Sequence, residues 1–249
     1  MIRVVGVGRI TKRPSVAFTS PSCRKIKELL GKRGVMAEGY PIMLNLAGRI
    51  CAVIGGGIVA TRKVIHLLEA QARVVVISSQ VTPTLEKLSA EERILLLRQD
   101  YQPDLLVDSQ PVLVFAATDS AHVNQQVAQD AQKIRAWVNI ADENAASDFS
   151  NMAATHRPPL TIAWHTGGTS PALSRHLKTI INDAIGEEYV MLARWLGDLR
   201  PQITNQVASQ KQRQNLYNAM FNSDILPLLR QGREQDAFQQ VQQLVRDWS

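Results

Sequence analysis

Residues 50–60 read ICAVIGGGIVA, and this stretch decides which fold the sequence predicts. Its first five residues have the apolar character of a buried strand, and a helical pattern continues to about residue 70. Gly55, Gly57 and Ala60 form the pattern GxGxxA where the helix begins. The first glycine permits a tight turn, the second lets a pyrophosphate approach the backbone, and the small third residue lets the helix pack closely. We therefore expect a dinucleotide at this helix start, and a tight turn with a purely structural role is the alternative.

Apolar runs and helical patterns alternate on the C-terminal side of this turn. Further strands are expected at residues 74–77, 94–97, 112–117 and 136–140, and helices at residues 85–90 and 122–133. Thr82 and Pro83 mark a helix start, because a hydroxyl can cap the first turn and proline suits the first helical position. Strands separated by helices form parallel sheets with helices on both faces. The sequence therefore predicts an α/β fold with a Rossmann-like doubly wound parallel sheet.

The pattern changes after residue 151, where a small α+β segment is expected. This segment, residues 152–185, holds the apolar run 160–164 and a helix that begins at Pro171. The segment is too short to bury its apolar run alone, so we expect it to be the dimerisation segment of a homodimer.

The last part of the chain predicts a C-terminal helical domain. Its residues are rich in Gln, Arg and Leu at helical spacing, and Pro201 and Pro227 should break it into shorter helices. The predicted organisation is a basic tail at 1–39, a dinucleotide-binding Rossmann domain at 40–151, the dimerisation segment at 152–185 and the helical domain at 186–249.

Positive charge is concentrated in the first 39 residues. They hold nine Lys or Arg and two acidic residues, whereas the remaining 210 residues hold 19 basic and 20 acidic ones, so the net charge of +6 belongs to the tail. The folded part is near neutral, which excludes a broad nucleic-acid-binding face. We expect the tail to be poorly ordered and the functional protein to start at Met36. A transit peptide or a docking arm is the alternative.

Composition excludes several other classes of protein. The apolar runs are shorter than the roughly 20 residues that a membrane-spanning helix needs, so no membrane partner is expected. Two cysteines are too few for a disulfide framework, and a reducing cytoplasm is the expected location. The five histidines show no paired spacing, and the motifs CxxC, HExxH and GxxxxGK followed by Ser or Thr are absent. Neither a protein-bound metal nor P-loop chemistry is therefore expected.

The strand ends supply the remaining candidates for a cofactor site, because ligands of such sheets bind at the carboxyl edge. The second strand ends at Ser78 without the acidic residue that commonly holds the adenosine ribose, and no arginine follows to receive a 2′-phosphate, which favours NAD over NADP. Asp119 either faces the cofactor or caps the helix after the fourth strand. The expected cofactor-binding residues are Gly55, Gly56, Gly57, Ile58, Val59, Ser78, Thr118 and Asp119.

Two further groups of residues are candidates for catalysis and substrate binding. Asp142 follows the fifth strand in a small, apolar setting, where it could act as a general base or cap the loop. The sequence TGGTSP at 166–171 begins a helix whose free N–H groups and positive dipole end would suit a carboxylate, although a plain capped helix start explains it too. Arg175 could clamp a carboxylate or lie at the surface. The expected substrate-binding residues are Asn139, Thr166, Gly167, Gly168, Thr169, Ser170 and Arg175.

Four motifs resemble the precorrin-2 dehydrogenase and sirohydrochlorin ferrochelatase family, which comprises the N-terminal module of siroheme synthase and its stand-alone relatives. They are IGGGIVA at 54–60, FAATD at 115–119, VNIADENAASDF at 138–149 and TGGTSP at 166–171, and the resemblance covers about residues 40–200. The resemblance implies oxidation of precorrin-2 to sirohydrochlorin with NAD and, in many members, insertion of ferrous iron to give siroheme. By motif, Asp142 matches the family's catalytic aspartate and residues 55–58 its dinucleotide turn. The family's dimers interlock through a segment corresponding to about 152–185, with a helical domain after it.

The chemistry of the residues agrees with this resemblance. Oxidation of a macrocycle needs a hydride acceptor and one base, which NAD and Asp142 would supply. Precorrin-2 carries several carboxylates, so a near-neutral fold would bind it through local donors such as the helix start at 169–171.

The departures from the family leave other functions open. No methyltransferase domain follows, which implies a stand-alone dehydrogenase, and His165 and Thr166 stand where serines are frequent in relatives. The last 50 residues match loosely, so iron insertion is left open. A regulatory NAD-sensing module and an unrelated small-substrate dehydrogenase are the alternatives, and both would explain GxGxxA but not TGGTSP.

Overall fold

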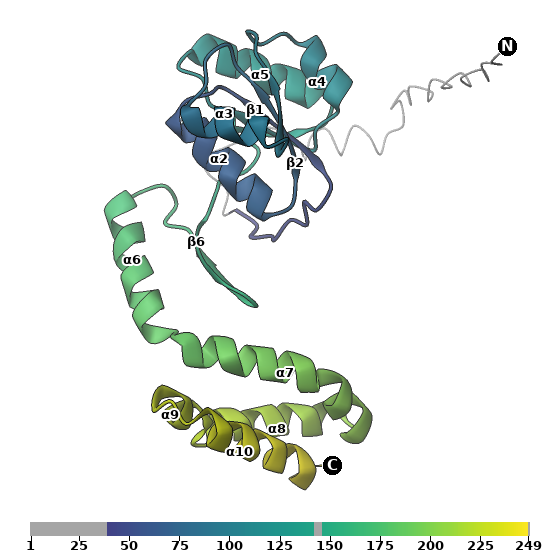
Figure 1. Ribbon diagram of the computed structural model, residues 1–249, viewed down its shortest axis with the longest axis vertical. Helices are drawn as coiled ribbons and strands as arrows, with labels where there is room; N and C mark the ends of the chain where they lie inside the picture. The colour runs from purple at the N-terminus through teal and green to yellow at the C-terminus, as the bar shows by residue number, and fades with distance from the viewer. Residues whose placement is uncertain (1–38, 142–145, 249) are drawn as a thin grey trace, which may run out of the picture. The chain divides into compact units, whose positions relative to one another are not determined.

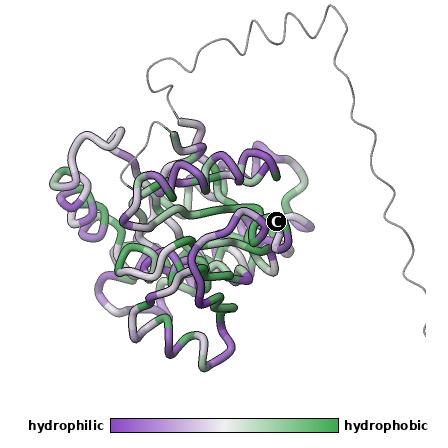
Figure 2. Tube along the Cα trace, turned by 90° about the horizontal axis from the view of Figure 1, so that it is seen from above, coloured by the Kyte–Doolittle hydropathy of each residue, from purple (hydrophilic) through white to green (hydrophobic). Residues whose placement is uncertain are grey.

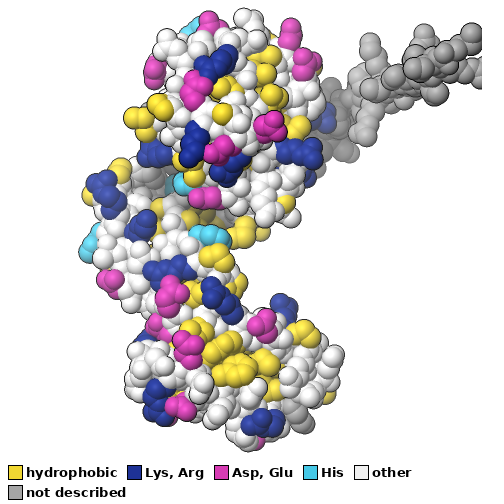
Figure 3. All heavy atoms as spheres, in the orientation of Figure 1, with side chains coloured by type: hydrophobic (Ala, Val, Ile, Leu, Met, Phe, Trp, Pro, Cys, Tyr) yellow, Lys and Arg dark blue, Asp and Glu magenta, His cyan; other side chains and the backbone are white. Residues whose placement is uncertain are grey.

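The computed structural model describes residues 39–141 and 146–248, which form two compact units (Figure 1). The first unit ends at Ser150 and the second begins at Asn151. Among the described residues, no helix is long and apolar enough to cross a membrane. Acidic and basic side chains intermingle over the face drawn in Figure 3, which agrees with the near-neutral charge of the folded part.

The first unit is built on a five-stranded parallel sheet with the order β3-β2-β1-β4-β5. Its strands are β1 Ile50–Ile54, β2 Arg73–Ile77, β3 Ile94–Leu97, β4 Leu113–Ala116 and β5 Trp137–Ile140. In register, Ile54 at the end of β1 lies opposite Ile77 of β2 and Ala116 of β4. The strand order changes direction at β1, so the glycine turn after β1 lies at the point where ligands of such sheets bind. This topology confirms the predicted doubly wound fold.

Helices cover both faces of the sheet. They are α2 Ile58–Glu69, α3 Pro83–Ala90, α4 Asp104–Ser109 and α5 Ala121–Lys133. Successive strand residues point to opposite faces, so Val53 packs in one core with α2 and α3 while Ile54 packs in a second core with α4 and α5. Figure 2 shows hydrophobic and hydrophilic residues alternating along the helices, as expected of helices with one buried face.

Local signals set most helix boundaries in this unit. The Thr82 hydroxyl accepts a hydrogen bond from the Leu85 amide at 3.4 Å, which confirms the predicted cap and places Pro83 in the first helical position. The six-residue helix α4 was not expected from the sequence, because Leu106 is its one buried residue and so short a helix has no visible periodicity.

The second unit starts with an antiparallel hairpin and continues as helices. The hairpin pairs β6 Ala153–Arg157 with β7 Leu160–Trp164. The helices are α6 Pro171–Ala184, α7 Glu187–Gln206, α8 Gln210–Phe221, α9 Ile225–Arg230 and α10 Glu234–Asp247. Helices α7 to α10 share one hydrophobic core, which includes Leu192, Ile203, Met220 and Val241. The predicted α+β segment and C-terminal helical domain are therefore both present.

The prediction that Pro201 breaks a helix is wrong, whereas Pro227 lies just after the break between α8 and α9. Helix α7 continues through Pro201, and α9 contains Pro227 in its first turn, where the amide needs no partner within the helix. Ile203, completely buried, anchors the following turn in the core. Tertiary packing therefore outweighs the local cost of the proline.

Candidate functional site

The three glycines after β1 differ in what surrounds them. Gly55 has a φ of +117°, and a Cβ at this residue would overlap the backbone of Ala117. A Cβ on Gly56 would overlap the backbone carbonyl of Gln80. Gly57 precedes α2 with a φ of −78°, and nothing lies within 4 Å of the position a Cβ would take. The first two glycines are therefore required by the fold, whereas Gly57 leaves open space in front of a helix N-terminus, which suits a phosphate.

A cleft of about 800 Å³ opens beside this turn at the carboxyl edge of the sheet. Its volume lies in the range of small-molecule and cofactor sites. The cleft is lined by residues from the ends of four strands and from α5, among them Gly55, Gly56, Gly57, Ser78, Ser79, Gln80, Thr82, Gln99, Asp100, Tyr101, Thr118, Asp119, Ser120, His122 and Gln126. Ile58 and Val59, also expected to bind the cofactor, are not among its lining residues, and Ile58 is 75% exposed.

The charge of the cleft is negative. Among its described lining residues, Asp100 and Asp119 are acidic and none is Lys or Arg. Arg98, which follows β3, forms an ion pair with Glu86 of α3. The cleft therefore offers no described cation to a 2′-phosphate.

Two threonines connect the glycine turn to α3. The Thr61 hydroxyl donates to the Gly57 carbonyl at 2.9 Å and lies 2.8 Å from the Thr82 hydroxyl. The Thr82 amide donates to the Gly56 carbonyl at 3.0 Å. Thr61 was not identified from the sequence, although a threonine in the first turn of a helix can bond the carbonyl four residues earlier. These bonds hold both Gly56 and Gly57 in place.

The loop after β4 is fixed by Asn124, which is buried. Its carbonyl oxygen accepts hydrogen bonds from the amide and hydroxyl of Thr118 at 3.1 and 2.7 Å. The cap of α5 is Ser120, whose hydroxyl accepts from the Val123 amide. The alternative that Asp119 caps this helix is therefore wrong, and Asp119 lines the cleft instead.

Residues 148 and 149, which follow β5 in the sequence, form hydrogen bonds with this strand. The Asn139 side chain is buried and donates to the Phe149 carbonyl at 2.9 Å, and the Asp148 carboxylate accepts from the Val138 amide at 3.0 Å. This hydrogen bond gives Asn139 a structural role, and its role in substrate binding stays a prediction. Asp142, the predicted catalytic base, lies outside the described residues.

In the second unit, the TGGTSP turn begins α6 as the sequence predicts. Gly167 and Gly168 have φ values of 64° and 74°, which favour glycine, and Ser170 caps the helix by accepting from the Leu173 amide at 3.1 Å. Thr169 instead donates its hydroxyl to the Thr166 carbonyl at 2.6 Å. Arg175 is exposed. Over residues 39–141 and 146–248, no group of three or more His, Cys, Asp or Glu is placed to hold a metal ion.

Comparison with known proteins finds two family models along the chain. Residues 42–153 match the model described as "Putative NAD(P)-binding", and residues 188–245 match the model described as the sirohaem synthase dimerisation region. The second match falls on α7 to α10 and not on the segment 152–185, whose role in dimerisation stays a prediction.

The similar proteins include siroheme synthases and one solved dehydrogenase. The chain is 36% identical over 208 residues to the siroheme synthase of Methylobacillus flagellatus, a match that covers 84% of the chain and 44% of that protein. It is 34% identical over 189 residues to siroheme synthase 2 of Klebsiella pneumoniae, covering 76% of the chain and 41% of that protein. The solved structure of "SirC, precorrin-2 dehydrogenase" superposes with a TM-score of 0.65 at 22% identity, covering 82% of the chain and all of that structure, which supports the fold.

The chain spans less than half the length of these curated relatives. Within that length it carries the NAD(P)-binding and dimerisation regions in sequence. These matches, together with the four motifs, show that the chain is similar to siroheme synthases over their NAD(P)-binding and dimerisation regions.

Proposed function

We propose that this protein is a precorrin-2 dehydrogenase that uses NAD to form sirohydrochlorin. The observation that carries the proposal is the open space in front of Gly57, at the head of α2 and inside the cleft of about 800 Å³. This arrangement suits the pyrophosphate of a dinucleotide. The siroheme synthase relatives and the precorrin-2 dehydrogenase of the same fold support the choice of substrate.

The charge of the cleft supports NAD over NADP. Asp100 and Asp119 would oppose a 2′-phosphate, whereas a ribose hydroxyl could donate a hydrogen bond to a carboxylate. Arg98 is engaged by Glu86 and therefore competes poorly for a phosphate. The site thus suits a cofactor whose adenosine half is uncharged apart from the pyrophosphate.

The chemistry divides between the cofactor and this chain. Bound NAD supplies the hydride acceptor. The chain must hold the dinucleotide at the glycine turn and remove one proton, and we assign the proton to Asp142, which follows β5 by two positions in the sequence. Strand β5 ends at the edge of the sheet where ligands of such sheets bind.

The carboxylates of precorrin-2 need donors, which we place on the turn at 166–170 and on Arg175. Ser170 and Pro171 set the start of α6, where the helix dipole favours a negative group. Arg175 is exposed one turn later and could bind a carboxylate with both guanidinium nitrogens. Asn139 of the first unit is proposed as a further substrate-binding residue.

The functional unit is proposed to be a homodimer in the cytoplasm. No residue of α6 is buried, and Leu173 and Ile180 on this helix are 46% and 48% exposed. A helix with apolar residues this exposed gains stability from a partner surface. Ferrous iron would be a substrate held by the nitrogens of sirohydrochlorin.

Asp142→Asn tests the proposal directly. The change keeps the shape of the side chain and removes the base, so precorrin-2 oxidation should fall by about 100-fold or more while NAD affinity stays within about twofold. Asp108→Asn is the matched control, because it removes an exposed carboxylate of α4 that does not line the cleft. Near-parent turnover in Asp142→Asn would exclude Asp142 as the base, and weakened NAD binding without a turnover defect would reassign it to the cofactor site.

A further inference from the structure

Asp130 of α5 is the one charged side chain that is buried among the described residues. Its exposed fraction is 4%, and the other buried polar residues in the described chain are Thr61, Asn124 and Asn139. A buried carboxylate is costly unless every oxygen finds a donor. The partners of Asp130 therefore show what this carboxylate is for.

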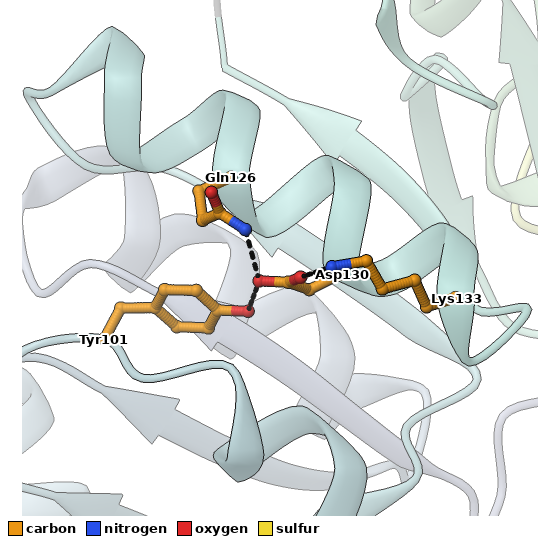
Figure 4. A network of polar contacts seen from close by, with 4 residues as sticks. All are labelled: Tyr101, Gln126, Asp130 and Lys133. Atoms are coloured by element: carbon orange, nitrogen blue, oxygen red, sulfur yellow. Dashed lines mark hydrogen bonds and ion pairs between the residues drawn. The ribbon is translucent and has the colours of Figure 1, made fainter.

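Three side chains donate hydrogen bonds to Asp130 (Figure 4). The Tyr101 hydroxyl and the Gln126 amide nitrogen both donate to Oδ2, at 3.1 and 3.0 Å. The Lys133 ammonium donates to Oδ1 at 2.7 Å. Burial alone would raise the pKa of the Asp130 carboxyl, but the bonds from Lys133, Gln126 and Tyr101 lower it below its ordinary value. The group is therefore a charged acceptor at neutral pH.

Two of these three partners line the cofactor cleft. Tyr101, from the loop after β3, and Gln126, from α5, are both lining residues, whereas Lys133 is not and its side chain is 70% exposed. The loop after β3 lies on the β2 side of the glycine turn, which is the side that takes the adenosine half in such folds. Asp130 thus fixes two side chains of the cleft wall, and one of them, Tyr101, comes from the adenosine side.

The charge of Asp130 also fixes which way the Gln126 amide is turned. A carboxylate only accepts hydrogen bonds, so the amide must present its NH₂ group to Oδ2. The acceptor that remains on Gln126 is its carbonyl oxygen, Oε1. An acceptor on the wall of an adenosine pocket matches the 6-amino group of adenine, which donates. It does not match hypoxanthine, which has a carbonyl oxygen in that position.

We propose that Asp130 is a positioning residue that holds Tyr101 and Gln126 as a preformed wall for the adenine base and thereby selects adenine over hypoxanthine. The proposal deepens the proposed NAD site and rests on it. Tyr101 supplies an aromatic surface whose position is set by its bond to Asp130. Burial and the neighbouring carboxylate raise the pKa of the Tyr101 hydroxyl, so this group stays a neutral donor.

The test compares NAD with nicotinamide hypoxanthine dinucleotide as ligands of the full chain. Titration calorimetry should show that the parent protein binds NAD about tenfold more tightly, because hypoxanthine leaves the Gln126 acceptor unpaired. In Asp130→Asn, the new amide can donate to Gln126 and allow it to turn over, so the preference should shrink to about twofold or reverse. Steady-state kinetics should show the same change in KM for the cofactor with little change in kcat.

Two more variants keep the test decisive if Asp130→Asn fails to fold. Gln126→Met removes the acceptor from a partly exposed position and should abolish the preference. Lys133→Gln is the matched control within the network, because it loses a bond to Asp130 but does not line the cleft, and its preference should equal that of the parent.

The results distinguish a failure of the proposed NAD site from a failure of the proposed role of Asp130. A parent protein that binds neither dinucleotide overturns the proposed function and this inference with it. A parent that binds both equally well overturns the inference alone. Equal preference in the parent and in folded Gln126→Met also overturns it, and so would a change in Lys133→Gln as large as that in Asp130→Asn, since the network would then act only through stability.

Discussion

Gly57→Val should separate cofactor binding from folding. The backbone of Gly57 has a φ of −78°, which L residues adopt freely, and nothing lies within 4 Å of the new Cβ. We therefore expect the free energy of unfolding to change by less than about 1 kcal/mol. The valine side chain would fill the space in which a pyrophosphate approaches the backbone.

The expected loss of affinity follows from the hydrogen bonds that the phosphate would lose. Two charge-assisted bonds from backbone amides, at about 1.5 kcal/mol each or more, amount to about 3 kcal/mol. This loss corresponds to a roughly 100-fold increase in the Kd of NAD. Titration calorimetry with NAD and thermal unfolding of the same samples measure the two effects separately.

Gly56→Ala, in contrast to Gly57→Val, should lower the stability of the fold. Its Cβ would overlap the Gln80 carbonyl and lie 2.7 Å from Val81 Cγ1, so the backbone must shift and stability should fall by about 1–3 kcal/mol. A folded Gly57→Val variant with unchanged NAD affinity would refute the assignment of this turn to the pyrophosphate. A Gly57→Val variant as unstable as Gly56→Ala would refute the claim that the space is open.

The remaining predictions concern the threonine contact, the helical domain and the oligomer. Thr61→Val removes the bond to the Gly57 carbonyl and should raise KM for NAD severalfold while lowering stability by about 1 kcal/mol, measured by steady-state kinetics and thermal unfolding. Burial would raise the pKa of the Glu188 carboxyl, but the hydrogen bond from Arg230 Nε to Glu188 Oε1, at 2.9 Å, lowers this pKa below its ordinary value of 4.5. The stability that this pair contributes should be present above pH 4.5 and lost as the pH falls further. The free energy of unfolding of Glu188→Gln should therefore depend less on pH in the acid range. Sedimentation should show a dimer at micromolar concentration, and a monomer alone would contradict the proposed homodimer.

The sequence was sufficient to predict the parallel sheet and the glycine turn after β1. Strand β1 and residues 74–77 of β2 are continuous apolar runs because both faces of a parallel sheet are buried, and such runs are visible without a structure. The helix starts at Thr82 and Ser170 were also visible, since a hydroxyl before a proline is a local signal.

The parts that the sequence did not reveal depend on contacts between distant residues. Tyr101 and Asp130 are 29 positions apart, and Asp130 looks like an ordinary polar residue of an amphipathic helix until its partners are placed. Ser120 and Asp119 are equally good caps by composition, and only the backbone path decides between them. The continuity of α7 through Pro201 likewise depends on the burial of Ile203.

The central claim is that this chain transfers a hydride from precorrin-2 to NAD. The most direct test is to add precorrin-2 to the purified full chain with NAD under anaerobic conditions and to follow the absorbance of NADH together with the spectrum of sirohydrochlorin. The account predicts that NADH and sirohydrochlorin appear in equal amounts, and that NADP replaces NAD poorly. A protein that binds NAD but forms no NADH with precorrin-2 would contradict the account and favour a regulatory NAD-sensing module.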